Sequence, residues 1–91
     1  MEFEWDEKKR DQVNKKHDVD LLYAALIFVG PVIERPDERK DYGEERTIAL
    51  GMIDGVPYTV VYTMRGSKTR LITAWRGGED EREEYQNRFP G

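Results

Sequence analysis

The 91-residue sequence contains no cysteine, only one histidine, and no acidic residue between positions 55 and 78. The absence of cysteine excludes disulfide bonds and thiolate zinc sites, and it is compatible with a reducing compartment. The longest apolar run, residues 21–29, is about half the length of a membrane-spanning helix, and the N-terminus lacks the apolar core of a signal peptide. We therefore expect a cytoplasmic protein with one small domain over residues 1–91.

Several motifs that identify enzymes are also missing. The sequence has no P-loop, no dinucleotide-binding glycine pattern, no HExxH motif and no serine nucleophile elbow. Residues 34–46 are rich in acids but lack the ligand spacing of a hard-cation loop, so we interpret them as a solvated charged loop. Neither a metal site nor a cofactor is predicted.

What the sequence does contain is a segregated positive charge. The chain has a net charge of −4, yet residues 55–78 contain four basic residues: Arg65, Lys68, Arg70 and Arg76. A concentrated cationic surface on an acidic background indicates a binding site for a polyanion. A structural interpretation stays open, because lysine and arginine on strands are often solvated residues that discourage edge-to-edge association.

Capping signals predict where the helices lie. Asp6 is positioned to cap a helix that extends to about residue 16, and Asp20 is positioned to cap an apolar core helix over residues 21–28. A final helix is expected from residue 79 to about residue 89, with acids in its first turn.

Period-two patterns predict the strands. A short strand is expected at residues 3–5 and three antiparallel strands at residues 46–53, 58–65 and 68–76. Two-residue turns at Asp54-Gly55 and Gly66-Ser67 connect the last three strands. The predicted fold class is α+β, with N-terminal helices packed on an antiparallel β-sheet meander and a C-terminal helix.

Alternation along these strands predicts which side chains share a face of the sheet. In the last strand, Arg70 and Arg76 are expected on one face and Trp75 on the other. Arg65 projects from the preceding strand near the same region. We therefore expect Arg65, Arg70 and Arg76 to form one cationic face, where guanidinium groups can donate paired hydrogen bonds to phosphate oxygens.

Other polar residues could take part in chemistry or binding. His17, at the end of the first predicted helix, is a candidate general acid or base, although a cationic imidazole at a helix C-terminus also has a purely capping role. Lys9 and Lys16 extend the basic surface from the same helix. Tyr62 and Tyr85 are candidates for stacking a base, although Tyr85 also has the spacing to pack the last helix onto the sheet.

A series of sequence blocks runs in order from Phe3 to Tyr85. These blocks include Phe3-Glu4-Trp5-Asp6, Lys16-His17 with Val19, Asp37-x-Arg39-x-Asp41-Tyr42-Gly43-Glu44-x-Arg46, Val60-Val61-Tyr62-Thr63-x-Arg65-Gly66 and Arg70-x-Ile72-Thr73-Ala74. In order and spacing they resemble the BrnT family, the ribonuclease toxins of bacterial type II toxin–antitoxin systems with a RelE-like fold.

The resemblance implies an RNA-cleaving toxin that inhibits translation. It also implies a BrnA-type ribbon-helix-helix antitoxin, together with which the toxin represses its own operon, so that operator DNA is bound only through the antitoxin. On this basis we expect a metal-independent endoribonuclease. The expected catalytic residues are His17, Arg65, Arg70 and Arg76, and the expected substrate-binding residues are Lys9, Lys16, Tyr62 and Tyr85.

The sequence departs from the family pattern around the expected site. Trp75 stands where the family commonly has arginine, Gly78 replaces a Ser or Thr helix cap, and Glu79-Asp80 replace basic residues. Asp18 replaces the usual glycine after the histidine. Two alternatives therefore stay open: a catalytically weak homologue that acts mainly as antitoxin partner and co-repressor, and a domain that binds RNA without cleaving it.

Overall fold

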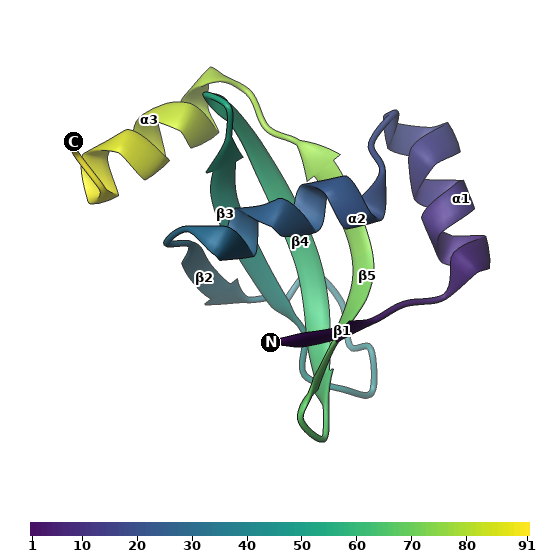
Figure 1. The fold of residues 1–91 in the computed structure, drawn as a ribbon. Coiled ribbons are helices and arrows are strands. Elements are labelled where there is room, and N and C mark those ends of the chain that lie inside the picture. The colour runs from purple at the N-terminus through teal and green to yellow at the C-terminus, as the bar shows by residue number, and fades with distance from the viewer.

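A computed structural model describes all of residues 1–91 and contains one five-stranded sheet with helices around it (Figure 1). The elements in chain order are β1 (Glu2–Glu4), α1 (Glu7–His17), α2 (Leu21–Ala24), the 3₁₀ helix η1 (Ala25–Val29), β2 (Ile33–Pro36), β3 (Thr47–Ile53), β4 (Val56–Arg65), β5 (Lys68–Arg76) and α3 (Glu79–Arg88). The spatial order of the strands is β1-β5-β4-β3-β2. The prediction of an α+β fold with a C-terminal helix is confirmed.

The turns of the meander form as their residues predict. Asp54 and Gly55 have φ values of 48° and 76°, which is the left-handed geometry that a two-residue hairpin turn requires. Gly66, in the turn between β4 and β5, has a φ of 63°. These turns fix the antiparallel pairing of β3 with β4 and of β4 with β5.

The N-terminal strand adds a feature that alternation did not predict. β1 pairs in parallel with the first residues of β5, so that Glu2 lies opposite Lys68 and Glu4 lies opposite Arg70. Carboxylates from the start of the chain are thereby brought beside two of the basic residues in the acid-free segment. The local charge of β5 therefore depends on a strand some 65 positions away along the chain.

Both ends of α1 follow from identifiable residues. The Asp6 side chain accepts a hydrogen bond from the Lys8 amide at 2.8 Å and caps the helix. Asp18 ends it in a left-handed conformation, with φ of 54° and its amide donating to the Asn14 carbonyl. A glycine adopts this conformation more readily than aspartate. The cap makes His17 the last residue of α1.

The apolar segment after α1 differs from the predicted core helix. It forms one turn of α-helix and continues as the 3₁₀ helix η1, and only one of its sides is buried. Leu26 and Val29 are 47% and 86% exposed. A helix that lies on one face of a sheet has only one side to bury. Ile27, on the buried side, lies very close to β3. A Cβ atom added at Gly51 would be only 2.5 Å from the Cβ of Ile27.

A β-bulge in β5 changes which residues share a face. Val61 pairs with Thr73 and Tyr62 pairs with Leu71, so Ile72 is an extra residue. An extra residue reverses the alternation beyond it. The prediction that Arg70 and Arg76 share a face is therefore wrong.

The pairs on either side of the bulge define the two faces. Arg76 pairs with Tyr58 on the first face, which α2 and η1 cover. Trp75 instead shares the second face with Arg70. A small second cluster of buried residues lies on that face, namely Ile48, Val61 and Ile72, with Trp75 packed against it.

In the view of Figure 1, the last helix lies to the left of the sheet and α1 to the right. α3 contacts β3 and β4, and the Tyr85 hydroxyl donates to the Pro31 carbonyl at 2.7 Å. The rings of Tyr85 and Phe89 lie 5.1 Å apart. No helix of the protein is long and apolar enough to cross a membrane.

Candidate functional site

The charged loop over residues 37–46 folds back onto the second face of the sheet. Its ends are joined by a hydrogen bond of 2.8 Å from the Asp37 amide to the Arg46 carbonyl. Thr63 of β4 donates its hydroxyl to the Glu45 carbonyl at 2.7 Å. The loop is therefore anchored to the sheet. Most residues between positions 34 and 46 are exposed, as the interpretation of a solvated charged loop predicts, but Asp37 is buried.

A buried carboxylate fixes the position of one arginine in this loop. The Asp37 side chain is 0% exposed and accepts two hydrogen bonds of 2.8 Å from the Arg39 guanidinium and one of 3.2 Å from the Arg39 amide. The guanidinium bonds are the main reason that the pKa of Asp37 falls to about 2. Arg39 remains 53% exposed and its guanidinium carbon lies 5.2 Å from the centre of the Trp75 ring.

A second arginine is fixed in a similar way. The guanidinium of Arg46 lies 4.0 Å over the Tyr42 ring and its Nε donates to the Glu44 carboxylate at 3.0 Å. The other oxygen of Glu44 lies 3.7 Å from Arg65 of β4. One carboxylate therefore links the loop to the end of the β4–β5 hairpin.

Helix α1 faces this loop and contributes basic residues. Lys9 and Lys16 line the space between the helix, the loop and β5, and neither has a carboxylate within ion-pair distance. His17 lies beside them, with its ring centre 6.2 Å from that of Trp75 and the rings inclined at 46°.

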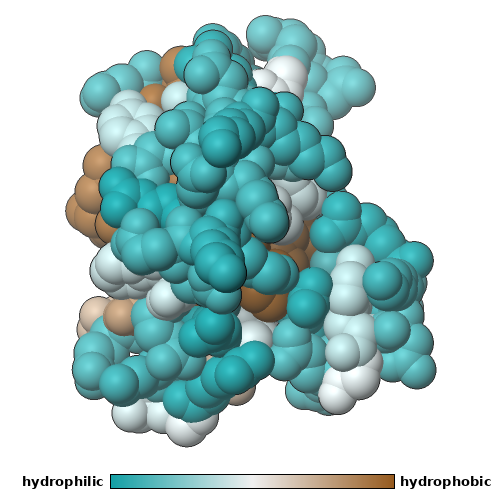
Figure 2. Space-filling model, turned by 90° about the vertical axis from the view of Figure 1, so that its right-hand side faces the viewer, coloured by the Kyte–Doolittle hydropathy of each residue, from teal (hydrophilic) through white to brown (hydrophobic).

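These segments enclose two adjoining hollows of about 290 and 530 Å³, which we together call the α1 cleft. Its lining consists of Lys9, Gln12, Val13, Lys16, His17, Arg39, Tyr42, Arg46, Ile72, Thr73, Trp75 and Arg76. Five of these residues are lysine or arginine, and none is aspartate or glutamate. Figure 2, which looks from the α1 side, shows a mostly hydrophilic face with a hollow that has hydrophobic residues at its bottom.

The largest hollow of the protein, of about 800 Å³, has the opposite charge. It lies on the other side of the 37–46 loop and has six acidic lining residues against three basic ones: Glu34, Asp37, Glu38, Asp41, Glu44 and Glu45 against Arg35, Lys40 and Arg46. No group of three or more acidic or histidine side chains is arranged to hold a metal ion. A polyanion is repelled from this surface, so charge favours the smaller α1 cleft.

The basic residues at the end of the β4–β5 hairpin differ from Lys9 and Lys16 because they have carboxylate partners. Arg65, Lys68 and Arg70 each have a carboxylate within ion-pair distance, at 3.7, 3.9 and 3.6 Å. The carboxylates belong to the loop and to β1. Three of the four basic residues in the segment that is free of acids in sequence are therefore paired with carboxylates from other parts of the chain.

The structure brings together only some of the residues predicted from sequence. Lys9, Lys16 and His17 meet in the α1 cleft, and Arg76 lines its rim. The side chain of Arg76 extends toward the first face, where one of its nitrogens lies 3.5 Å from the Tyr58 hydroxyl. Arg65 and Arg70 lie outside the cleft lining, and so do the two predicted tyrosines.

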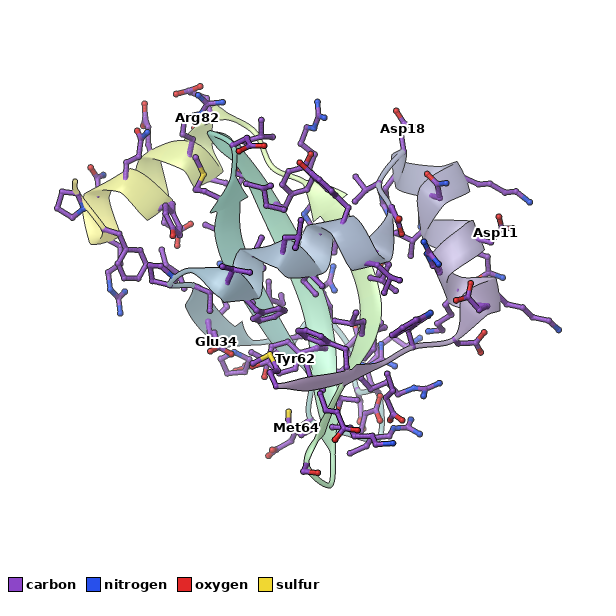
Figure 3. All side chains as sticks on the ribbon, viewed as in Figure 1. Asp11, Asp18, Glu34, Tyr62, Met64 and Arg82 are labelled. Carbon is purple, nitrogen blue, oxygen red and sulfur yellow. The ribbon has the colours of Figure 1, made fainter.

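The two tyrosines lie among structural contacts. Tyr62 is on the first face, where its hydroxyl donates to Glu34 (Figure 3) and its ring packs edge-on against Phe28. Burial and the neighbouring Glu34 carboxylate raise the pKa of Tyr62 to about 12, so its hydroxyl stays protonated. Tyr85 is held by Pro31 at the far end of the sheet. Neither is placed to contact a ligand in the cleft.

Three residues that line the α1 cleft were not predicted as site candidates from the sequence, namely Arg39, Tyr42 and Arg46. The signal was present in the block Asp37-x-Arg39-x-Asp41-Tyr42-Gly43-Glu44-x-Arg46, where each arginine follows an acid by two positions. Such spacing allows the acid to fix the arginine, as both pairs show. The high charge of the loop concealed this pattern.

The lining of the α1 cleft contains five basic residues and no acid, although Arg39 and Arg46 are paired with Asp37 and Glu44 outside the lining. The charge of this lining suits a polyanion. The family model described as "Ribonuclease toxin, BrnT, of type II toxin-antitoxin system" matches residues 5–81, and the chain belongs to this family. No curated protein matches the chain. The family assigns the general activity of a ribonuclease toxin and an antitoxin as partner.

Proposed function

We propose that this protein is a metal-independent endoribonuclease with a RelE-like fold that cleaves RNA in the α1 cleft and thereby inhibits translation. The observation that carries the proposal is the composition of that cleft, which has five lysine or arginine residues, the one histidine of the chain and no carboxylate. Nitrogen donors of this kind suit phosphate oxygens, and they supply the charge stabilisation that phosphoryl chemistry needs.

In the proposed reaction the ribose 2′-oxygen attacks the adjacent phosphorus and the bond from phosphorus to the 5′-oxygen breaks. His17 accepts the proton of the 2′-hydroxyl, since an imidazole nitrogen can act as a general base. Lys16, which lines the same hollow, donates a proton to the leaving 5′-oxygen. The products are a 2′,3′-cyclic phosphate and a 5′-hydroxyl.

Arg39 and Lys9 are the proposed stabilisers of the charge that develops on the phosphorane. Arg39 uses its Nε and one terminal nitrogen to bond Asp37, which leaves the other terminal nitrogen free to donate to phosphate. A donor that is already fixed needs no reorganisation when the charge appears, and this is what makes preorganised groups effective.

The hairpin arginines have an outer role in this proposal. Arg65 and Arg70 lie on the same sheet face as the cleft and contact the RNA backbone beyond the cleaved phosphate, while Arg76 contacts it at the rim. RNA phosphates must compete with Glu44 and Glu4 for the first two arginines. Their contribution to binding is therefore smaller than that of the unpaired lysines.

The proposed partner is a BrnA-type ribbon-helix-helix antitoxin. One of its segments lies across the α1 cleft and carries acidic side chains that pair with Lys9 and Lys16. Such a segment neutralises the cleft and excludes RNA at the same time. Repression of the operon then uses the DNA-binding domain of the antitoxin, with the toxin as co-repressor.

The direct test is cleavage of a single-stranded RNA by the purified protein in the presence of EDTA. The expected result is cleavage that yields cyclic phosphate ends and that falls by about 10²- to 10⁴-fold in His17→Ala. Tyr62→Phe, which alters a hydroxyl on the other face, should cleave at the parent rate. A parent that cleaves only with added metal ions, or a His17→Ala variant with full activity, would contradict the proposal.

A second candidate function is a catalytically weak toxin homologue that acts mainly as antitoxin partner and co-repressor. The observation that favours it is the pairing of Arg65, Lys68 and Arg70 with carboxylates, which lowers the positive charge available to RNA. This alternative predicts a tight complex with the antitoxin and promoter binding by that complex. It also predicts no RNA cleavage by the folded chain, whether or not ribosomes are present.

A further inference from the structure

The indole of Trp75 occupies an unusual place for a large aromatic side chain. Trp75 is half-buried, packs against the buried cluster of Ile48, Val61 and Ile72, and is the one hydrophobic residue in the lining of the 530 Å³ hollow. The other lining residues of this hollow are cationic or polar: Lys16, His17, Arg39, Thr73 and Arg76. A rigid aromatic ring is thus set among groups that suit phosphate.

The position of the ring is fixed by the sheet and by two neighbours. The backbone of Trp75 pairs with Thr59. Arg39 lies over the ring at 5.2 Å from its centre, and the ring centre of His17 lies 6.2 Å away. Trp75 is nevertheless only half-buried and lines the hollow, so part of its side chain is accessible from there.

We propose that Trp75 is a stacking platform for one nucleobase of the RNA, next to the phosphate that Arg39 binds. Aromatic side chains beside cationic grooves bind single-stranded nucleic acids in this way, because each base presents a flat π surface while the cations hold the backbone. A hollow of about 530 Å³ lies within the range of small-molecule sites. This inference rests on the proposed function, since it assumes that RNA enters the α1 cleft.

The bulge at Ile72 is what makes the platform possible. Without the extra residue, Trp75 would lie on the opposite face from Arg70, as regular alternation predicts. The bulge turns it toward the loop and α1 instead. Bulges commonly re-aim side chains next to functional sites.

Fluorescence offers a test that does not depend on cleavage. The chain has two tryptophans, so the Trp5→Phe variant leaves Trp75 as the sole indole. A single-stranded 2′-O-methyl RNA, which lacks the attacking hydroxyl, is titrated into this variant and binding is measured by anisotropy of a label on the RNA. The same titration is repeated with an oligonucleotide that has the same backbone but no bases.

The expected result is quenching of Trp75 by the base-containing oligonucleotide and none by the abasic one, although both bind. Binding without quenching would overturn the stacking inference and leave the proposed function intact. A folded protein that binds neither oligonucleotide would overturn both.

Two substitutions at position 75 separate stacking from packing. Trp75→Leu keeps an apolar side chain against the cluster of Ile48, Val61 and Ile72 but removes the π surface, whereas Trp75→Phe keeps a ring. We expect affinity for the base-containing oligonucleotide to fall about 5- to 150-fold in Trp75→Leu and to stay within about 3-fold of the parent in Trp75→Phe. Equal affinities for both variants would contradict the inference.

Discussion

Basic residues occur in two regions of this molecule, and the two regions differ in what surrounds them. At the end of the β4–β5 hairpin, Arg65, Lys68 and Arg70 each have a carboxylate nearby. In the α1 cleft, Lys9 and Lys16 have none, and the carboxylates that pair with Arg39 and Arg46 lie outside the lining. Basic residues that cluster in the sequence are therefore not all equally available to bind an anion in the folded protein.

Arg39 of the 37–46 loop is held in place more firmly than the arginines of the hairpin. Arg39 is held by a carboxylate that is completely buried, so its position is fixed, while the Arg39 side chain is 53% exposed. The hairpin pairs are longer than 3.5 Å and involve exposed or half-exposed groups. Exposed pairs of this kind contribute little to stability, so they hold their arginines weakly.

Among single substitutions of the loop and hairpin arginines, the largest effect on RNA cleavage is expected from Arg39. Arg39→Ala removes a fixed donor to the phosphorane and should lower kcat for RNA cleavage by about 10²-fold. Arg39→Lys should restore only part of the rate, because an ammonium cannot reproduce the paired bonds to Asp37. Rates are measured on a defined RNA, with Arg35→Ala, a change of the same charge outside the cleft, as the control. Equal losses in Arg39→Ala and Arg35→Ala would show that only net charge matters.

The buried carboxylate should make stability depend on pH. The pKa of Asp37 is lowered from 3.8 to about 2, so its contribution to stability is complete above about pH 4 and is lost as the pH falls toward 2. The difference between the two pKa values corresponds to about 2 kcal/mol at neutral pH. Urea unfolding of Asp37→Asn should therefore show lower stability than the parent at pH 7.

That deficit of Asp37→Asn should shrink between pH 4 and pH 2, as the parent loses the contribution of its own carboxylate. Glu38→Gln removes a neighbouring charge that is exposed and serves as the control. A deficit that stays constant over this pH range would mean that the pair with Arg39 does not stabilise the loop.

The smallest effect is expected at the end of α1, next to the cleft. Asp18 has a φ of 54°, so Asp18→Gly should raise the free energy of unfolding by about 0.5–1 kcal/mol. The same replacement at Asp11, inside the helix, should lower it by about 0.5–1 kcal/mol. Thermal unfolding measures both. A stabilising effect at both positions would show that removal of negative charge, rather than backbone conformation, is responsible.

Local signals in the sequence predicted most of the elements. Asp6 and Asp20 cap the helices where their side chains indicated, and Asp54-Gly55 forms the expected turn. The candidate site was predicted less well, because it depends on three events without a strong local signal. These are the bulge at Ile72, the parallel pairing of β1, and the return of the 37–46 loop to the second face.

Each of these events alters the site in a definite way. Because of the bulge, Arg76 lies on the opposite face of the sheet from Arg70, and Trp75 lies on the same face as Arg70. The β1 pairing neutralises Lys68 and Arg70, and the loop brings Arg39 to the cleft. The alternation of side chains along a strand and the net charge of a segment each describe one part of the chain. Neither reveals a neighbouring strand or an ion-pair partner that comes from a distant part of the chain.

The most direct test of the α1 cleft as the site of RNA cleavage compares two double variants that remove the same charge. One is Lys9→Ala with Lys16→Ala in the cleft, and the other is Lys68→Ala with Arg70→Ala on the hairpin. Initial rates of RNA cleavage are measured at one salt concentration for both. We predict a loss of at least about 10²-fold for the cleft variant and of no more than about 3-fold for the hairpin variant. A hairpin variant that loses as much activity as the cleft variant, or more, would show that the α1 cleft is not the site of RNA cleavage.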